Sequence, residues 1–152
     1  MIINTLGFAN KKYKQLVTIV SAKTIKFLNQ PDTELTIKFV SCREIKRLNK
    51  TFRNINKVTD VLSFPATNIK AGEVLDSNAE PYLGDCALCL AVAKRQAKQF
   101  GTTLEAEIQK LVVHSILHLL GYDHISDSDY EVMSKKEEQI KEFFIKENIC
   151  GI

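Results

Sequence analysis

Residues 114–124 read His-Ser-Ile-Leu-His-Leu-Leu-Gly-Tyr-Asp-His, and this stretch contains every histidine of the chain. His114 and His118 are four residues apart on a predicted helix, so their side chains leave the same face one turn apart. Gly121 predicts the end of that helix, because glycine adopts the left-handed backbone conformation that other residues resist. His124 follows three residues later. We therefore expect this stretch to form the buried central helix and to bring three imidazoles together.

Three imidazoles at this spacing are typical of a metal site. Neutral nitrogen ligands suit Zn²⁺, and three protein ligands leave a fourth position open. An ion held in this way lowers the pKa of bound water to about 7 and stabilises negative charge on a carbonyl or phosphoryl oxygen. We expect one Zn²⁺ per chain, with Ni²⁺ or another divalent ion as alternatives, held by His114, His118 and His124. The plainer alternative is a set of hydrogen-bonded core histidines.

The spacing also matches the zinc-peptidase pattern H-E-x-x-H-x-x-G-x-x-H, apart from Ser115 at the glutamate position. That glutamate is the general base, and a serine hydroxyl cannot replace it near pH 7. Glu107 lies on the same helical stripe, but about 10 Å from His114 along the axis, so we expect it to be solvent-exposed. Peptide hydrolysis is therefore disfavoured.

Composition favours an ordinary water-soluble chain. Its 152 residues fit one domain, 1–152, and the 21 Lys and Arg exceed the 18 Asp and Glu by only three charges. No apolar run reaches the roughly 18 residues that span a bilayer, and residues 1–14 lack a signal-peptide pattern. We expect a cytoplasmic protein without a membrane partner and with free thiols at its four cysteines: Cys42, Cys86, Cys89 and Cys150. Cys86 and Cys89 are expected to be buried and inert.

Hydrophobic periodicity predicts an α+β fold. The expected strands lie near 2–8, 35–39, 58–64 and 83–90, and the expected helices lie near 11–29, 42–50, 91–100, 102–120 and 126–144. Capping boxes predict three of the helix starts, at the pairs Ser41 and Glu44, Thr102 and Glu105, and Ser126 and Asp129. Residues 66–81 lack periodicity and are long for a loop, which predicts a mobile segment or a functional lid.

The small net charge conceals an asymmetry between the two halves of the chain. Residues 1–76 contain 13 Lys and Arg against 6 Asp and Glu, whereas residues 77–152 contain 8 against 12. Lys and Arg provide most of the affinity for nucleic-acid backbones. The candidate RNA-binding residues are Lys57 and four that share one helical face: Arg43, Lys46, Arg47 and Lys50. A merely solvated helix face is the alternative.

Single charged residues supply further candidates. Arg53 is expected just past the basic helix, where its guanidinium can bind phosphate oxygens in bidentate fashion. Asp85 and Asp123 can orient an imidazole through a hydrogen bond, or can simply bond to a turn.

Three segments together resemble the YbeY family of bacterial rRNA maturation factors, which are described as metal-dependent endoribonucleases. Residues 114–124 resemble the family signature. Residues 59–65, Thr-Asp-Val-Leu-Ser-Phe-Pro, resemble a second motif of the family, and residues 83–85, Leu-Gly-Asp, resemble a third. The resemblance implies a zincin-like domain, in which about five helices cover a small mixed four-stranded sheet. It also implies that the three histidines bind zinc and that Arg53 and His114 are catalytic. Ser115 departs from the family's usual glycine, and we expect it to narrow the space beside the metal.

The resemblance implies a zinc-dependent endoribonuclease, specific for single strands, that acts in small-subunit rRNA maturation and ribosome quality control. Expected partners are ribosomal RNA, ribosomal proteins of the small subunit and an assembly GTPase. The attacking group, water or a ribose 2′-hydroxyl, stays open. The alternatives are a ribosome-assembly binding factor with a structural metal and, less favoured, a metallopeptidase-like hydrolase.

Overall fold

A four-stranded mixed sheet with helices on both faces forms the framework of the computed structural model, which describes residues 1–79 and 81–149. The elements in chain order are β1 (Ile2–Gly7), α1 (Lys11–Phe27), β2 (Glu34–Phe39), α2 (Cys42–Arg53), β3 (Val61–Pro65), the short 3₁₀ helix η1 (Ser77–Ala79), β4 (Tyr82–Leu88), α3 (Leu90–Gln99), α4 (Leu104–Leu119) and α5 (Asp127–Lys146). The predicted α+β class is confirmed. No helix within the described ranges is both long enough and apolar enough to cross a membrane.

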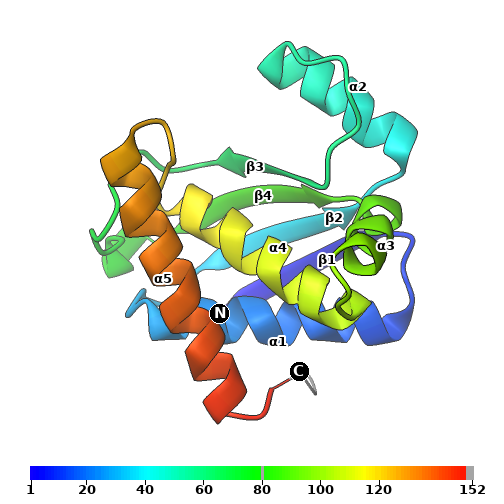
Figure 1. Ribbon diagram of the computed structural model, residues 1–152. Coiled ribbons are helices and arrows are strands. Elements are labelled where there is room, and N and C mark those ends of the chain that lie inside the picture. Colours follow the sequence, from blue (N-terminus) through cyan, green and yellow to red (C-terminus); the bar gives the residue numbers. More distant parts are fainter. Residues whose placement is uncertain (80, 150–152) are drawn as a thin grey trace.

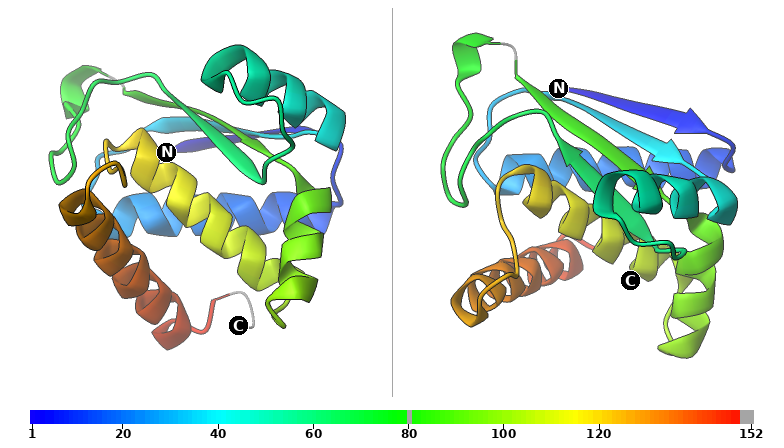
Figure 2. Two further views of the ribbon diagram at one scale, coloured as in Figure 1. Left: turned by 45° about the horizontal axis from the view of Figure 1, so that its top comes forward. Right: turned by 90° about the horizontal axis from the view of Figure 1, so that it is seen from above.

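The sheet has the strand order β1-β2-β4-β3. β1, β2 and β4 are parallel, and the edge strand β3 runs antiparallel to β4. Parallel neighbours need a crossover connection, which α1 provides between β1 and β2. Figures 1 and 2 show α1 and α4 together on one face of the sheet, with α5 against α4. The main core lies between this face and the helices, and the alternating residues Leu35, Ile37 and Phe39 of β2 point into it.

Helix α2 packs on the opposite face of the sheet through a smaller apolar cluster. Ile45 of α2 is fully buried against Leu62 of β3 and Ala87 of β4. The Ser41 hydroxyl accepts a hydrogen bond from the Glu44 backbone N–H, as the capping box predicts. This packing places the carboxyl end of α2 beside the edge strand β3.

Two expected helix ends are wrong by a residue or more. Arg53 is the last residue of α2 rather than a residue beyond it, because the left-handed turn that ends the helix falls at Asn54 (φ 58°). Thr103, and not Thr102, caps α4 through a hydrogen bond from the Ala106 N–H. The Thr102 N–H bonds to the Ala97 carbonyl and so belongs to the end of α3.

The described part of the segment 66–81 is bonded to the core near its middle. Leu75 is buried, and its N–H donates to the Gln30 side chain, whose amide donates in turn to the Glu73 carbonyl. No described residue of this segment lines the cavity at the histidines. The expectation of a mobile or lid-like segment overlooked these bonds to the end of α1, which connect positions more than 40 residues apart.

The thiols behave as expected where the structure describes them. Cys86 and Cys89 are buried, and burial raises the pKa of the Cys86 thiol to about 12, which makes it unreactive. Cys42, Cys86 and Cys89 form no disulfide, although Cys42 Sγ lies 3.6 Å from Cys89 Sγ. Cys150 lies outside the described residues.

A Schellman motif ends α4 at Gly121. The Gly121 N–H bonds to the His118 carbonyl and the Tyr122 N–H to the Leu117 carbonyl, while Gly121 adopts a φ of 87°. A side chain at Gly121 would collide with the backbone of Ile69. The turn therefore needs glycine twice, for its conformation and for the close approach of another segment.

We expect Gly121→Ala to lower the free energy of unfolding by at least about 2 kcal/mol, because a clash with Ile69 adds to left-handed strain of about 1–2 kcal/mol. Gly101→Ala is the matched control. Gly101 is also left-handed (φ 64°), but no atom lies within 4 Å of the added carbon. Urea unfolding measures both, and equal losses in the two variants would show that contact with residues 66–81 is unimportant.

Candidate metal centre

The three histidines converge where α4 ends. His114 and His118 come from the last two turns of α4, and His124 comes from the segment that returns after the Gly121 turn. Their candidate ligand atoms all lie within 4.8 Å of one another. The rings are 4.6–5.8 Å apart between centroids. The structure thus brings together the three residues that the spacing predicts, and this cluster could hold a metal ion.

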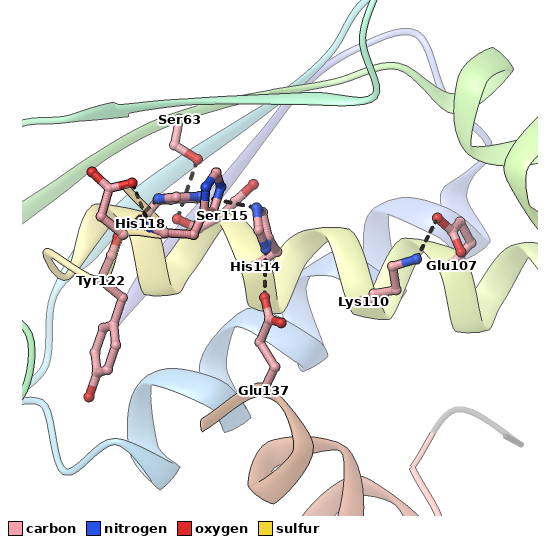
Figure 3. Close-up of polar contacts among 10 residues, drawn as sticks. Ser63, Glu107, Lys110, His114, Ser115, His118, Tyr122 and Glu137 are labelled. Carbon is pink, nitrogen blue, oxygen red and sulfur yellow. Dashed lines mark hydrogen bonds and ion pairs between the residues drawn. The ribbon is translucent and has the colours of Figure 1, made fainter. Parts of the chain in front are cut away.

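Hydrogen bonds on the outer nitrogens orient two of the rings (Figure 3). His118 Nδ1 lies 3.0 Å from the Tyr122 carbonyl oxygen, and His114 Nδ1 lies 2.6 Å from Glu137 Oε1. A carbonyl and an ionised carboxylate only accept hydrogen bonds, so both Nδ1 atoms must donate. In the neutral rings, the Nε2 lone pairs are therefore free to bind another group.

Those two Nε2 atoms lie only 3.0 Å apart. Two lone pairs at this distance repel each other unless they share a cation, either a proton or a metal ion. Two nitrogen ligands of a tetrahedral zinc ion are separated by about 3.4 Å, given bonds of about 2.1 Å. The donor set, the tautomers and the spacing of the histidines therefore fit a divalent metal ion.

Electrostatics favour the neutral form of His118. Burial lowers the pKa of its imidazole, and repulsion from the nearby rings of His114 and His124 lowers it further. Because a metal binds the neutral imidazole, this shift keeps the lone pair available near neutral pH.

A cavity of about 910 Å³ opens over the cluster. All three histidines line it, and so do Arg53 and Lys57. The Arg53 guanidinium donates to the Ser63 carbonyl on β3 at 3.3 Å, and the Ser63 hydroxyl donates to the Ser115 carbonyl on α4 at 3.4 Å. Ser63 therefore connects the arginine to the helix that carries His114 and His118.

Two expectations about residues of α4 are wrong. The Ser115 side chain is 1% exposed and does not line the cavity, so it narrows no space beside the histidines. It faces the sheet, where Cys86 of β4 is a neighbour. Glu107 is 2% exposed rather than solvated, because its stretch of α4 is covered by neighbouring elements.

Neither aspartate that the sequence suggests orients an imidazole ring. Asp85 accepts a hydrogen bond from the Tyr82 hydroxyl at 2.8 Å, on the face of the sheet away from α4, and the Tyr82 oxygen lies 3.0 Å from the Thr36 hydroxyl, which can donate to it. Asp123 accepts from the His124 backbone N–H at 2.8 Å instead of from a ring nitrogen. The orienting groups are Glu137 and the Tyr122 carbonyl. Sequence reasoning missed Glu137 because it lies on α5 among several other acidic residues.

The basic face of α2 does not form a wall of the cavity. The four basic residues of this face are exposed and point away from the buried residue Ile45: Arg43, Lys46, Arg47 and Lys50. Among the basic candidates, only Arg53 and Lys57 line the cavity. The four exposed residues stay candidates for contacts with RNA outside the cavity.

Comparisons with known proteins extend the likeness beyond the histidine segment. Residues 3–144 match the family described as Endoribonuclease YbeY. The chain is 48% identical over 122 residues to an endoribonuclease YbeY of Caldicellulosiruptor bescii, covering 77% of each chain. It is 40% identical over 126 residues to one of Clostridium botulinum, covering 74% of this chain and 76% of that relative. The solution structure of TM1509 from Thermotoga maritima has a similar fold, with a TM-score of 0.60 and 27% identity over 96% of this chain and 93% of that one.

We expect Glu137→Ala to weaken Zn²⁺ binding roughly 10- to 100-fold, because the carboxylate fixes the His114 ring and increases the basicity of its Nε2 atom. Glu137→Gln keeps an acceptor but loses the charge, so its affinity for Zn²⁺ should lie between those of the wild type and Glu137→Ala. The control is Glu138→Ala, which alters a neighbouring carboxylate of the same cavity that bonds to no histidine. Competition with a chromophoric chelator measures the affinities, and equal affinities for Glu137→Ala and Glu138→Ala would contradict the assignment.

Proposed function

The chain belongs to the YbeY family of endoribonucleases, and from this premise we propose that it is a zinc-dependent enzyme that cleaves single-stranded RNA. The single observation that carries the zinc dependence is the pair of Nε2 atoms 3.0 Å apart, each on a ring whose other nitrogen must donate. We propose small-subunit ribosomal RNA as the substrate in maturation and quality control. Ribosomal proteins and an assembly GTPase stay predicted partners.

His114, His118 and His124 would hold the ion through three neutral nitrogens. When bound, a divalent cation supplies positive charge that stabilises the negative charge developing on phosphoryl oxygens. His114 is held by Glu137 and His118 by the Tyr122 carbonyl, so the two rings need little reorganisation when they bind. No histidine is left over as an independent general base, because the chain has only these three.

Arg53 is the proposed phosphate-binding residue of the site. Its guanidinium has five N–H donors, and the bond to the Ser63 carbonyl occupies only one of them. The remaining donors can bind two phosphate oxygens in parallel, a geometry that lysine cannot provide. The Ser63 bridge holds this group over the same cavity as the histidines. Arg53 would therefore orient the scissile phosphate and neutralise its charge.

The exposed face of α2 is proposed to bind the RNA chain beyond the cavity. Its four basic side chains precede Arg53 on the same helix, so a strand with one phosphate at Arg53 can continue along them. Such contacts are electrostatic and independent of sequence.

The second candidate function is a binding factor whose metal only holds the fold together, and the extent of the core argues against it. None of the three histidines is buried, and the main core is continuous from α1 through the sheet to α5. A chain with a core of this extent does not need an ion to fold, unlike small metal-stapled domains. Ser115, in place of the glutamate that follows the first histidine of the peptidase pattern, still disfavours the peptidase alternative.

We expect a chelator to abolish RNA cleavage, added Zn²⁺ to restore it, and cooperative thermal unfolding to persist throughout. His118→Ala should lose metal and cleavage and still fold, because the core does not depend on the ion. Elemental analysis, a labelled single-stranded RNA and circular dichroism give the three readouts. Unfolding upon chelation would support the structural-metal alternative, and metal-independent cleavage would contradict the proposal.

We expect the Arg53→Ala variant and the double variant Arg43→Glu/Lys50→Glu to affect different steps, the first the rate of cleavage and the second the binding of RNA. The first should lower kcat roughly 100-fold with a smaller effect on KM, because its contact strengthens as charge develops on the phosphate. The double variant should weaken binding to unrelated RNA sequences and flatten the salt dependence of affinity, since fewer counterions are released. Steady-state kinetics and salt titrations separate the two effects. An unchanged salt slope in the double variant would remove α2 from the RNA path.

A further inference from the structure

A buried carboxylate lies in the same cavity, away from the histidines, and the proposed chemistry does not use it. Glu107 is two helical turns before His114 on α4, about 10 Å along the axis, and it lines the cavity. Its Oε1 atom is buried and has no hydrogen-bond donor. Lys110 Nζ lies 3.4 Å from this atom, so the charge of the Glu107 carboxylate is balanced although no hydrogen bond forms. A buried acceptor without a donor is energetically costly, and such a group is retained only where something compensates the cost.

Helix stabilisation does not explain why Glu107 is buried. A carboxylate in the first turn of a helix interacts favourably with the helix dipole even when it is exposed. Glu105 already occupies the first turn of α4, where it is paired with Lys12 near the surface. Burying a second carboxylate here adds a desolvation cost that the dipole alone does not require.

Large apolar side chains that are exposed to solvent also line the cavity. Ile55 and Val58, which precede β3, are 48% and 38% exposed, and Phe100 after α3 is 59% exposed, yet all three line the cavity. Apolar walls with a few convergent polar groups are typical of a ligand site. The ligand is therefore expected to have apolar faces and at least one N–H donor on its edge.

A nucleobase has these properties, whereas a phosphate diester offers a carboxylate no N–H donor and has no apolar face. We propose that this part of the cavity binds the base next to the cleaved phosphate, and that the Glu107 carboxylate accepts a hydrogen bond from its exocyclic amino group. Carboxylates accept in this way from cytosine N4. Cytosine, adenine and guanine carry an amino group and uracil does not, so the site selects the first three over uracil.

The placement of the two groups fits one nucleotide in one cavity. The phosphate lies at the histidines and Arg53, and the base extends along α4 towards Glu107. This inference rests on the proposed endoribonuclease function, because it assigns a base specificity to that site. The exposed basic face of α2 is proposed to contact only the RNA backbone, so this base preference does not depend on it.

The test uses metal-loaded enzyme and single-stranded oligoribonucleotides that differ only in the base beside the cleavage site. Wild type should cleave the cytidine or adenosine substrate with a kcat/KM roughly tenfold above that for the uridine substrate. Glu107→Gln should reduce this preference to near unity, because an amide also donates to the uracil carbonyl. Glu107→Asp, which draws the carboxylate back, should lower cleavage of the amino-bearing substrates without improving that of uridine.

Glu105→Gln is the matched control, since it removes the same charge from the same helix outside the cavity, and it should keep the wild-type preference. Thermal unfolding of every variant reports whether it folds. If Glu107→Gln does not fold, the base preference of Glu107→Asp decides the test. Equal base preference in wild type and both Glu107 variants would overturn the nucleobase site while cleavage itself continues. Absence of cleavage for every oligonucleotide would overturn the endoribonuclease proposal, on which this inference rests.

Discussion

The candidate site depends on how α4 ends. The left-handed turn at Gly121 closes the helix, directs the chain back so that His124 approaches His114 and His118, and places the Tyr122 carbonyl where it accepts from His118 Nδ1. One backbone conformation thus supplies the third imidazole and orients the second. The contact of Gly121 with Ile69 also joins this turn to the long segment before β4. A residue with a side chain would disturb the site and the fold together.

The facing imidazoles are a second constraint that follows from the first. Because Glu137 and the Tyr122 carbonyl can only accept, they require the two inner nitrogens to present lone pairs to each other. The main core supports this arrangement, and none of the three histidines is buried in it. The fold therefore holds in place a site that is unfavourable by itself, which is typical of functional centres.

Sequence patterns predicted those features that short segments determine. The pair of histidines four residues apart, the glycine after them and the hydroxyl caps at Ser41 and Ser126 act over one or two turns, so local spacing was sufficient. Predictions failed where residues far apart decide the outcome. Asp85 and Glu137 illustrate this, since the sequence gives no sign that the first lies on the far face of the sheet and that the second reaches His114 from α5.

The sequence by itself therefore determined the α+β class, the three-histidine cluster and the family to which the chain belongs, because periodicity and motif spacing are local properties. Only the tertiary structure decided which carboxylate orients His114, that Ser63 links Arg53 to α4, and that Glu107 is buried in the cavity. These outcomes depend on how β3, α4 and α5 pack, which brings residues tens of positions apart within hydrogen-bond distance. Burial and hydrogen-bond partners are properties of that packing, and no single segment contains them.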